Sequence, residues 1–495
     1  MDPTLLMVQA KLFHTAVGTA YADLQVDDHR ETWPIRSRPF RAWLRRSYYE
    51  AAGTAASALA IKIALDQLEA RAQFDSPERS VHLRVAECGN RIYLDLADSK
   101  WRAVEIAAPG WRVIDNPPVR FRRPPGLLPL PLPKRSGSLD ALRQLVNLPN
   151  DDDFVLVVAW LLAALRSNGP YPLLAISGEQ GSAKTVLCKL LKAIVDPNVA
   201  PVRALARDER ELMIAATNSH VLAFDNVSAL PAWLSDALCR LASGGSLAVR
   251  QLYTDDEEVL FHAARPTLLN SIEDVVSRPD LADRAIFLTL APIGDKQRQL
   301  EGALWRKFER ARPEILGALL DVAAKALKKR PRVRSKPLPR MADFARWAAA
   351  CETALWPAGT VAQAYAANRQ ASVEGIIEAD PVAACVRDIM AEHHQWSGTA
   401  SDFLHAAEKR QREEVSIRRP DWPRTPRALA GRLRRAQTTL RTVGIDVTFY
   451  REGRAGNRII RMRTATGNAV STVGSGHPNR SRTPGQIAAT ASDKN

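Results

Sequence analysis

An apolar run that opens onto a glycine-rich loop constrains the fold of this chain more than any other feature. Residues 173–185 read LLAISGEQGSAKT, and an apolar, helical pattern follows at residues 186–191. A buried strand, a short loop and a helix start in that order are typical of a phosphate-binding loop, because the loop amides and the helix N-terminus present N–H groups to a polyphosphate. The alternative is a turn that joins strand to helix and binds nothing.

We predict that this loop binds ATP. Its nucleotide-binding residues are Gly178, Glu179, Gln180, Gly181, Ser182, Ala183, Lys184 and Thr185. The Lys184 ammonium would lie on the outer phosphates, and the Thr185 hydroxyl would be a ligand of Mg²⁺. Ala183 stands where the pattern expects the glycine before the lysine. Since alanine is the smallest replacement, we expect a slightly tightened loop that still binds nucleotide.

The whole chain sets wide bounds on organisation and partners. Its 495 residues are too many for one ordinary core, so several domains are expected. The net charge of +15 favours a polyanionic partner, although an arginine-rich genome would produce the same excess. The five cysteines are scattered without metal-ligand spacing, which argues against zinc. Because neither a signal peptide nor a membrane-spanning stretch is evident, we expect a cytoplasmic protein with no membrane partner.

Shifts in composition predict the domain organisation. The expected segments are an N-terminal α+β module (residues 1–123), a proline-rich linker (124–137), a P-loop ATPase core (138–324), a basic linker (325–340), a helical region (341–395), a winged-helix-like unit (396–463) and a disordered tail (464–495). Alternating apolar residues from Val81 predict an antiparallel meander in the first module. The core is expected to be an α/β fold, a parallel sheet with helices on both faces.

Three later strands of the core end or begin at residues that suit ATP hydrolysis. An apolar run leads to Asp225, another leads to Asn270, and Arg284 precedes a third run at residues 285–290. This order resembles the P-loop ATPases of the AAA+ type, in which such an asparagine orients the attacking water and such an arginine reaches the nucleotide of a neighbouring subunit. The predicted catalytic residues are Asp225, Asn226, Asn270 and Arg284, and the predicted Mg²⁺ ligands are Thr185 and Asp225.

A helix end with two glycines and a two-stranded hairpin lie between Asp225 and Asn270. Residues 241–254 read LASGGSLAVRQLYT, and an acidic turn then precedes the apolar residues 259–261. Here the chain resembles superfamily 3 helicases, notably the primase-helicases of poxviruses, phages and mobile elements. The resemblance spans roughly residues 150–295. It implies a homo-oligomer such as a hexamer, in which Arg250 and Tyr253 contact single-stranded DNA in the pore.

Besides Ala183, two positions depart from that family. Ser246 replaces the usual aspartate of the glycine segment. Asn226 stands where a second acid commonly activates the attacking water, and an asparagine cannot accept its proton. Either an upstream carboxylate takes this part, or hydrolysis is slow. The upstream candidates are Asp208, Glu209 and Glu211.

The C-terminal unit combines an arginine-rich helix with a basic hairpin. Leu429, Leu433, Leu440 and Val443 recur at roughly helical spacing, and two strands follow at residues 445–450 and 458–463. This pattern resembles a winged helix-turn-helix, with the helix in the major groove of duplex DNA and Arg451 and Arg454 on the wing. The predicted DNA contacts of this unit are Arg432, Arg435 and Arg454. The alternative is a solvated charged helix packed on an ordinary hairpin.

The N-terminal module carries no comparable signature. A basic and aromatic cluster would suit nucleic acid, or equally an amphipathic helix with its aromatic residues in a core. Its members are Arg36, Arg38, Arg41, Trp43, Arg45, Arg46 and Tyr48. Asp95 and Asp98 superficially resemble the paired acids of archaeo-eukaryotic primases, but the spacing is wrong and no supporting histidine motif follows.

Together these patterns favour an ATP-driven, DNA-acting motor, a helicase-like ATPase of mobile-element or phage-type replication that uses ATP and Mg²⁺. The alternative from another class is a switch that binds ATP and assembles on DNA with little or no unwinding, and Asn226 keeps it open. A small-molecule kinase is disfavoured by the hairpin and by Arg284, which belong to oligomeric ATPases.

Overall fold

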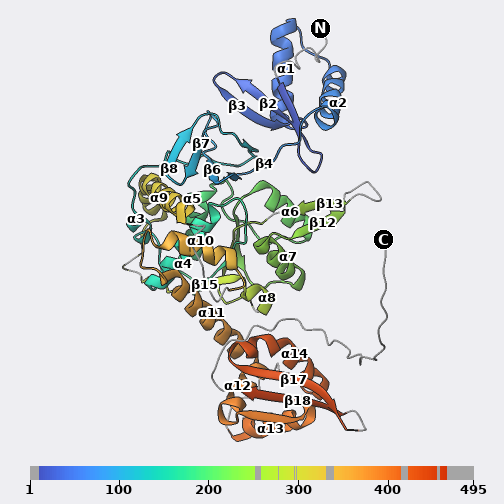
Figure 1. Ribbon diagram of the computed structural model, residues 1–495, viewed down its shortest axis with the longest axis vertical. Coiled ribbons are helices and arrows are strands. Elements are labelled where there is room, and N and C mark those ends of the chain that lie inside the picture. Colours follow the sequence, from blue (N-terminus) through green and yellow to red (C-terminus); the bar gives the residue numbers. More distant parts are fainter. Residues whose placement is uncertain are drawn as a thin grey trace, which may run out of the picture. The chain divides into compact units, whose positions relative to one another are not determined.

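The computed structural model describes residues 10–250, 258–262, 264–276, 278–294, 296, 298–329, 339–413, 422–453 and 457–464. The chain divides into two compact units, Met1–Ile376 and Ile377–Asn495. The strands of the first unit are β1 (Ala10–His14), β2 (Ala20–Val26), β3 (His29–Pro34), β4 (Val81–His82), β5 (Val85–Cys88), β6 (Arg91–Asp95), β7 (Ala103–Ala107), β8 (Gly110–Ile114), β9 (Arg120–Phe121), β10 (Leu173–Gly178), β11 (Leu222–Val227), β12 (Ser246–Arg250), β13 (Glu258–His262), β14 (Thr267–Ser271) and β15 (Ala285–Leu290). Its helices are α1 (Arg38–Ala52), α2 (Ala58–Phe74), α3 (Asp140–Arg143), α4 (Asp151–Ala164), α5 (Lys184–Val195), α6 (Glu209–Asn218), α7 (Ala232–Ser243), α8 (Pro279–Ala282), α9 (Glu301–Lys329), α10 (Ala342–Glu352) and α11 (Thr360–Ala379), the last of which crosses the division (Figure 1).

A four-stranded parallel sheet forms the middle of the first unit, in the order β11–β14–β10–β15. Successive residues of a strand face opposite sides. Leu174 and Ile176 therefore join a cluster with α4, α5, α9 and α10, whereas Leu173 and Ala175 join a cluster with α6, α7 and α8. The predicted parallel sheet with helices on both faces is confirmed.

The helices that flank the loop strand begin at clear sequence signals. Asn150 caps α4 by accepting the backbone N–H of Asp153, and three aspartates occupy the first turn, where negative charge is favoured. Almost all of α4 is buried, which fits its continuous apolar sequence. The segment that precedes the loop strand in the core thus contains the two helices α3 and α4.

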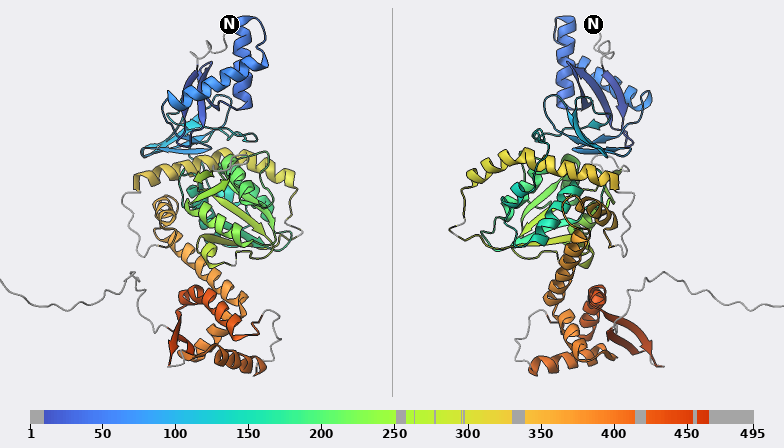
Figure 2. Two further views of the ribbon diagram at one scale, coloured as in Figure 1. Left: turned by 90° about the vertical axis from the view of Figure 1, so that its right-hand side faces the viewer. Right: turned by 60° about the vertical axis from the view of Figure 1, so that its left-hand side comes forward.

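The predicted meander is also confirmed, as the antiparallel sheet β5–β6–β7–β8. One of its faces joins the large cluster that includes α9. The indole N–H of Trp111 donates to Asp321 on α9 over 2.8 Å. Figure 2 shows α9 lying between this sheet and the parallel sheet. The meander is therefore part of the same compact unit as the core.

The sequence patterns did not predict the three-stranded sheet β1–β2–β3. Its buried residues include Ala22 and Leu24, which pack against α1 and α2 in a core of their own. Asp23 is buried between strands and accepts the Thr32 hydroxyl over 2.7 Å and the Arg120 guanidinium over 2.7 Å. A buried aspartate in β2 breaks the apolar alternation on which strand prediction depends.

The proline-rich segment 124–137 holds no helix or strand, as predicted, but it is closely packed. Leu130 donates its N–H to Leu96, and Lys134 donates its N–H to Pro313 of α9. A Cβ at Gly317 of α9 would lie 1.7 Å from the carbonyl oxygen of Lys134, so only glycine permits this approach. The segment connects the meander to the core along a fixed path.

Two boundaries differ from the predicted ones. Helix α9 continues to Lys329, inside the predicted linker 325–340, of which residues 330–338 lie outside the described residues. The predicted helical region 341–395 contains α10, α11 and α12 (Pro381–Glu392). The two compact units divide within this region, between Ile376 and Ile377.

The second unit is a small α+β fold. After α12 come β16 (Gln395–Thr399), α13 (Ala400–Glu413), α14 (Pro426–Thr442), β17 (Ile445–Glu452) and β18 (Asn457–Thr464). The strands form an antiparallel sheet in the order β16–β18–β17. Leu429, Leu433 and Leu440 of α14 are buried, as their spacing predicted. Of the predicted tail, residues 465–495 lie outside the described residues. Over the described part of the chain, no helix is long and apolar enough to cross a membrane.

Candidate nucleotide site

The glycine-rich loop leaves the carboxyl edge of β10 and enters α5. Gly178 has φ 141°, and a Cβ there would lie 2.5 Å from the carbonyl oxygen of Leu290 on the neighbouring strand β15. The first glycine of the loop is therefore required by the close approach of β15. The first turn of α5 directs backbone N–H groups without intrahelical partners toward the loop.

Ala183 adopts a left-handed conformation, with φ 66° and ψ 27°. Its Cβ makes this conformation unfavourable by about 1–2 kcal/mol, a cost that glycine does not have. The glycine expected before the lysine is thus a requirement of backbone conformation. This chain has an alanine in place of that glycine, and the backbone is therefore strained at the residue that precedes α5.

Lys184 folds back over the loop. Its ammonium donates to the carbonyl oxygens of Gly178 over 2.7 Å and Glu179 over 2.8 Å. The side chain therefore lies against the loop, so its charge is close to the loop amides that would hold an anion.

Three predicted site residues meet at the carboxyl edge of the sheet. The Thr185 hydroxyl donates to Oδ1 of Asp225 over 2.9 Å. The side-chain amide of Asn270 donates to the Thr185 hydroxyl over 3.0 Å and also to Oδ1 of Asp225. The sheet order explains the meeting, because β14, which carries Asn270, lies between β10 and β11. Carboxylate and hydroxyl oxygens are ligands that Mg²⁺ prefers, so Thr185 and Asp225 fit such an ion.

Asn226 interrupts β11 beside this cluster. It is exposed and left-handed, with φ 55°, at a register shift between Phe224 and Val227. Its backbone N–H donates to Oδ1 of Asp225 over 3.0 Å. Asparagine is one of the few residues that tolerate this conformation, so the backbone can turn here. Its side chain, however, is not a base.

The three upstream acids are engaged at the start of α6. Asp208 caps the helix by accepting the N–H of Glu211, and Glu211 in turn accepts the N–H of Arg207. Glu209 pairs with Arg240 over 2.8 Å. Each of these carboxylates has a local structural partner.

Arg284 lies away from the other predicted catalytic residues. It precedes β15 at the amino edge of the sheet, whereas the loop leaves the carboxyl edge, about 17 Å along the strand. Its guanidinium donates to the carbonyl oxygen of Asp280 over 2.6 Å. Neighbouring arginines pair with carboxylates instead, Arg278 with Asp236 and Arg369 with Asp283. Among the described residues Arg284 has no carboxylate partner within 4.0 Å, and it cannot reach the loop of its own chain.

One residue that supports the loop was not predicted. Asn147 donates from its side-chain amide to the carbonyl oxygens of Ser182, over 3.2 Å, and Ala291, over 2.7 Å. It thereby connects the loop to the segment that follows β15. The only signal in the sequence is a polar residue within the apolar run Leu145-Val146-Asn147-Leu148.

The far end of α5 is anchored by a buried ion pair that the sequence also did not reveal. Arg84 and Asp196 are 0% and 1% exposed and lie 3.2 Å apart. Asp196 also accepts the backbone N–H groups of His220 and Val221. Burial would raise the pKa of Asp196, but Arg84 and Lys192 outweigh it and hold that pKa below its ordinary value. Burial lowers the pKa of His220 to about 4.

The predicted hairpin forms as the antiparallel pair β12–β13. Arg250 is the last residue of β12 and lies in register with Glu258. Tyr253 lies outside the described residues.

Two family models match the chain. Residues 139–374 match the actinomycete integrative conjugative element replication protein, and residues 382–478 match the AICE RepA C-terminal domain. Together they cover well over half of the 495 residues. The chain belongs to the RepA family of actinomycete integrative conjugative elements. No curated protein matches it.

Two solved structures are similar to this RepA-family chain. The A form of the apo NrS-1 C-terminal region is 12% identical, with a TM-score of 0.44, over 94% of this chain and 99% of that chain. The SCCmec type IV Cch, described as an active helicase, is 10% identical, with a TM-score of 0.46, over 92% of each chain.

The match to the RepA C-terminal domain covers the predicted duplex-binding arginines. Arg435 is exposed, Arg432 is half-buried and lies 3.5 Å from Asp380, and Arg454 lies outside the described residues. Arg432 and Arg435 belong to the lining of a hollow of about 560 Å³ on α14. The other lining residues are Pro423, Arg427, Ala428 and Gly431. On the hairpin, Arg451 lies directly opposite Arg458.

The paired acids of the first module have structural partners. Asp95 is 1% exposed and binds the Arg123 guanidinium over 2.7 Å, and Asp98 binds Arg102 over 2.6 Å. Their carboxylates serve the fold of this module, and they give no support to a primase site.

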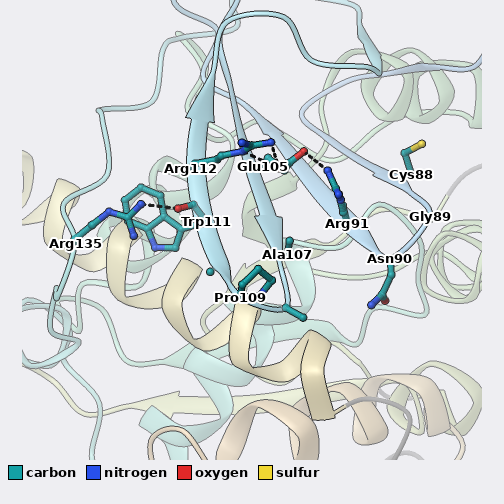
Figure 3. Close-up of a pocket in the computed structure, with 12 residues that line it drawn as sticks. Cys88, Gly89, Asn90, Arg91, Glu105, Ala107, Pro109, Trp111, Arg112 and Arg135 are labelled. Atoms are coloured by element: carbon teal, nitrogen blue, oxygen red, sulfur yellow. Dashed lines mark hydrogen bonds and ion pairs between the residues drawn. The ribbon is translucent and has the colours of Figure 1, made fainter.

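A second hollow, of about 670 Å³, lies at the turn end of the β5–β8 sheet (Figure 3). The carboxylate of Glu105 joins Arg91, over 3.0 Å, to Arg112, over 2.9 Å. Burial raises the pKa of Glu105, but the hydrogen bonds from Arg91, Tyr93 and Arg112 outweigh it, so the pKa lies below its ordinary value. Arg135 stacks over Trp111 at 4.5 Å. The charged side chains of this hollow are thus engaged, Arg91 and Arg112 with Glu105 and Arg135 with Trp111.

Proposed function

We propose that this replication protein is an ATP-dependent, DNA-acting motor, a helicase-like ATPase of the superfamily 3 type. The observation that carries the proposal is the cluster of Thr185, Asp225 and Asn270 beside Lys184 at one edge of a parallel sheet. A phosphate loop, an acid and a polar strand end at one edge are the parts that ATP hydrolysis needs.

Each residue of the cluster has a role in this proposal. Lys184 and the loop from Gly178 to Thr185 hold the phosphates, and Thr185 and Asp225 hold Mg²⁺. When bound, the ion would neutralise charge on the outer phosphates. Asn270 already directs its amide at Thr185 and Asp225, and it orients the attacking water beside them.

Arg284 acts in a neighbouring copy of the chain. It has a carbonyl partner and lies at the opposite edge of the sheet from the loop, about 17 Å away, so it serves a nucleotide only across an interface. An arginine that reaches the transferred phosphoryl group stabilises its charge. We therefore propose a homo-oligomer, a hexamer in keeping with the resemblance to superfamily 3.

DNA contacts come from two places in this proposal. The hairpin β12–β13 carries Arg250 and Tyr253 to single-stranded DNA. The second unit grips duplex DNA as a winged helix-turn-helix, with α14 in the major groove and β17–β18 as the wing. The like-charged pair Arg451 and Arg458 supports this role, because directly opposed like charges destabilise a hairpin and a phosphate would relieve them.

A nucleotide-dependent switch remains the second candidate, and Asn226 favours it. A left-handed asparagine holds the position of the usual water-activating acid, and the upstream acids are occupied at α6. Such a protein would bind ATP tightly and assemble on DNA while hydrolysing slowly.

One experiment separates the two candidates. ATP turnover is measured with and without single-stranded DNA, alongside displacement of one strand from a forked duplex. A motor shows turnover that DNA stimulates, together with displacement. A switch shows tight ATP binding without turnover or displacement.

A further inference from the structure

The basic and aromatic cluster near the start of the chain separates into two sets in the structure. Arg36 pairs with Asp66 over 2.7 Å and with Glu69 on α2. Trp43 packs against Phe40, with ring centroids 5.4 Å apart, and both belong to or pack on the small core of this module. That core is formed by α1, α2 and β1–β3, which Figure 1 shows together. These members of the cluster stabilise the module itself.

The second set, Arg38, Arg41 and Arg45, forms one exposed row along α1, and Tyr49, which was not a member of the cluster, continues this row. Arg38, Arg41, Arg45 and Tyr49 are all exposed, Tyr49 by 59%. At 3.6 residues per turn they fall within an arc of about 80° and extend over about 16 Å. The buried Phe40 and Leu44 lie on another face of the helix, about 140° and 100° around it from the middle of this arc. We call these four residues the α1 row.

The arginines of the α1 row are unpaired over the described residues, since none has a carboxylate within 4.0 Å. Arg46, the next residue along, differs because it pairs with Glu50 over 2.7 Å. Exposed arginine side chains usually contribute little to the stability of the fold, so the guanidinium groups of this row are available to bind a partner.

The charges of α1 are arranged against the stability of the helix. Its first turn contains Arg38 and no acid, and its last turn contains no base. The helix macrodipole favours the reverse order, with acids first and bases last. Helix stability therefore does not explain the row.

We propose that the α1 row binds single-stranded DNA. Guanidinium groups recognise phosphate oxygens through paired hydrogen bonds, and a tyrosine in line with them offers a face on which an unpaired base stacks. A base within a duplex is already stacked on both sides, so the aromatic end of the row favours a single strand. This site goes beyond the proposed function, because α1 lies outside both family-matched segments, 139–374 and 382–478.

The test uses the full-length protein without nucleotide and a fluorescent oligothymidylate over a range of salt concentrations. The triple variant R38Q/R41Q/R45Q should bind at least tenfold more weakly. Its log–log salt slope should be shallower by about 2, because each lost phosphate contact on a single strand removes about 0.7. Binding of a blunt duplex should change much less.

Neighbouring positions on the same helix provide matched controls. Arg45→Gln and Arg46→Gln remove the same charge, but only Arg45 belongs to the row, so only Arg45→Gln should weaken binding. Tyr49→Ala should weaken binding about fivefold or more with little change in salt slope, and Tyr49→Phe should retain it.

One further variant distinguishes a role of the row in DNA binding from a role in the stability of the fold. Arg38→Glu should raise the free energy of unfolding, since it places an acid in the first turn, while it weakens binding of the oligonucleotide. If Arg38→Glu lowers both the free energy of unfolding and the affinity for the oligonucleotide, Arg38 only supports the fold.

Several results would overturn the proposal. They are an unchanged affinity and salt slope in the triple variant, an equal loss for Arg45→Gln and Arg46→Gln, and an equal loss of duplex and single-strand binding. Binding of the oligonucleotide is measured in the absence of nucleotide, so it does not depend on ATP binding or hydrolysis. The binding result can therefore be interpreted even if the proposed ATPase function proves wrong.

Discussion

The hydroxyl of Thr185 donates to the carboxylate of Asp225 over 2.9 Å, although the two residues lie 40 positions apart in the chain. Thr185 lies in the first turn of α5, which follows β10, and Asp225 lies on β11; in the sheet, β14 separates β10 from β11. Asn270 on β14 bridges them with its amide. Each of these three side chains is held by the other two. They can therefore bind a metal ion with little movement.

Lys184→Ala should weaken ATP binding by at least about tenfold, because a charge-assisted hydrogen bond to a phosphate is lost. The fold should be retained, since among the described residues the ammonium donates only to the carbonyl oxygens of Gly178 and Glu179 and to the Ser182 hydroxyl. Lys189→Ala is the matched control on the same helix, where the lysine lies 3.6 Å from Glu301. Equal nucleotide affinity in the two variants, measured by titration calorimetry, would remove the basis of the proposed site.

The sequence predicted this site because its residues stand at strand ends. Asp225 and Asn270 each follow an apolar run, and parallel strands bring their carboxyl ends to one edge. Arg84 and Asp196 offered no such signal, because they pair across 112 positions and neither interrupts a regular pattern. The left-handed backbone of Ala183 and Asn226 was equally hidden, since it is a property of the loop and bulge in three dimensions.

Ala183→Gly should raise the free energy of unfolding of the first unit by about 0.5–1 kcal/mol. Relief of the left-handed strain gives about 1–2 kcal/mol, and the greater freedom of glycine in the unfolded chain offsets part of it. Ala193→Gly, inside the same helix, should instead lower the free energy by about 1 kcal/mol. Denaturant titrations of the two variants should therefore move in opposite directions. A loss of stability in Ala183→Gly would contradict the strained loop.

His220 should make the first unit sensitive to acid. Its pKa is about 4 in the folded chain, against 6.5 when exposed, so the unfolded chain binds the proton first. Stability therefore falls as the pH drops below 6.5, by about 2 kcal/mol between pH 7 and pH 5, and the loss is complete below pH 4. His220→Gln keeps a polar partner for Ala164 without the titration. Its unfolding free energy should depend less on pH over that window, and a parallel dependence in both proteins would rule out His220 as the cause.

Arg284→Ala and Lys184→Ala should each abolish ATP turnover alone and restore part of it when mixed. A mixed oligomer contains interfaces where an intact loop from one protomer meets an intact Arg284 from the other. Arg278→Ala is the control from the same surface, because Arg278 is paired with Asp236 over 2.9 Å and should be dispensable. No recovery on mixing, or a protein that stays monomeric with ATP, would exclude action across subunits.

Asn226→Asp should raise ATP turnover by at least about tenfold, because a carboxylate beside the cluster accepts the proton that an asparagine cannot. The substitution suits the backbone, since aspartate tolerates the φ of 55° that Asn226 adopts. Asn226→Ala is the control. It also removes the amide but adds no base, so turnover should stay low. ATP affinity should change little in either variant, so that the effect lies in the rate of hydrolysis. If Asn226→Asp turns over ATP no faster than the parent, while single-stranded DNA still stimulates the parent strongly, the proton leaves by another group and the motor does not depend on this position.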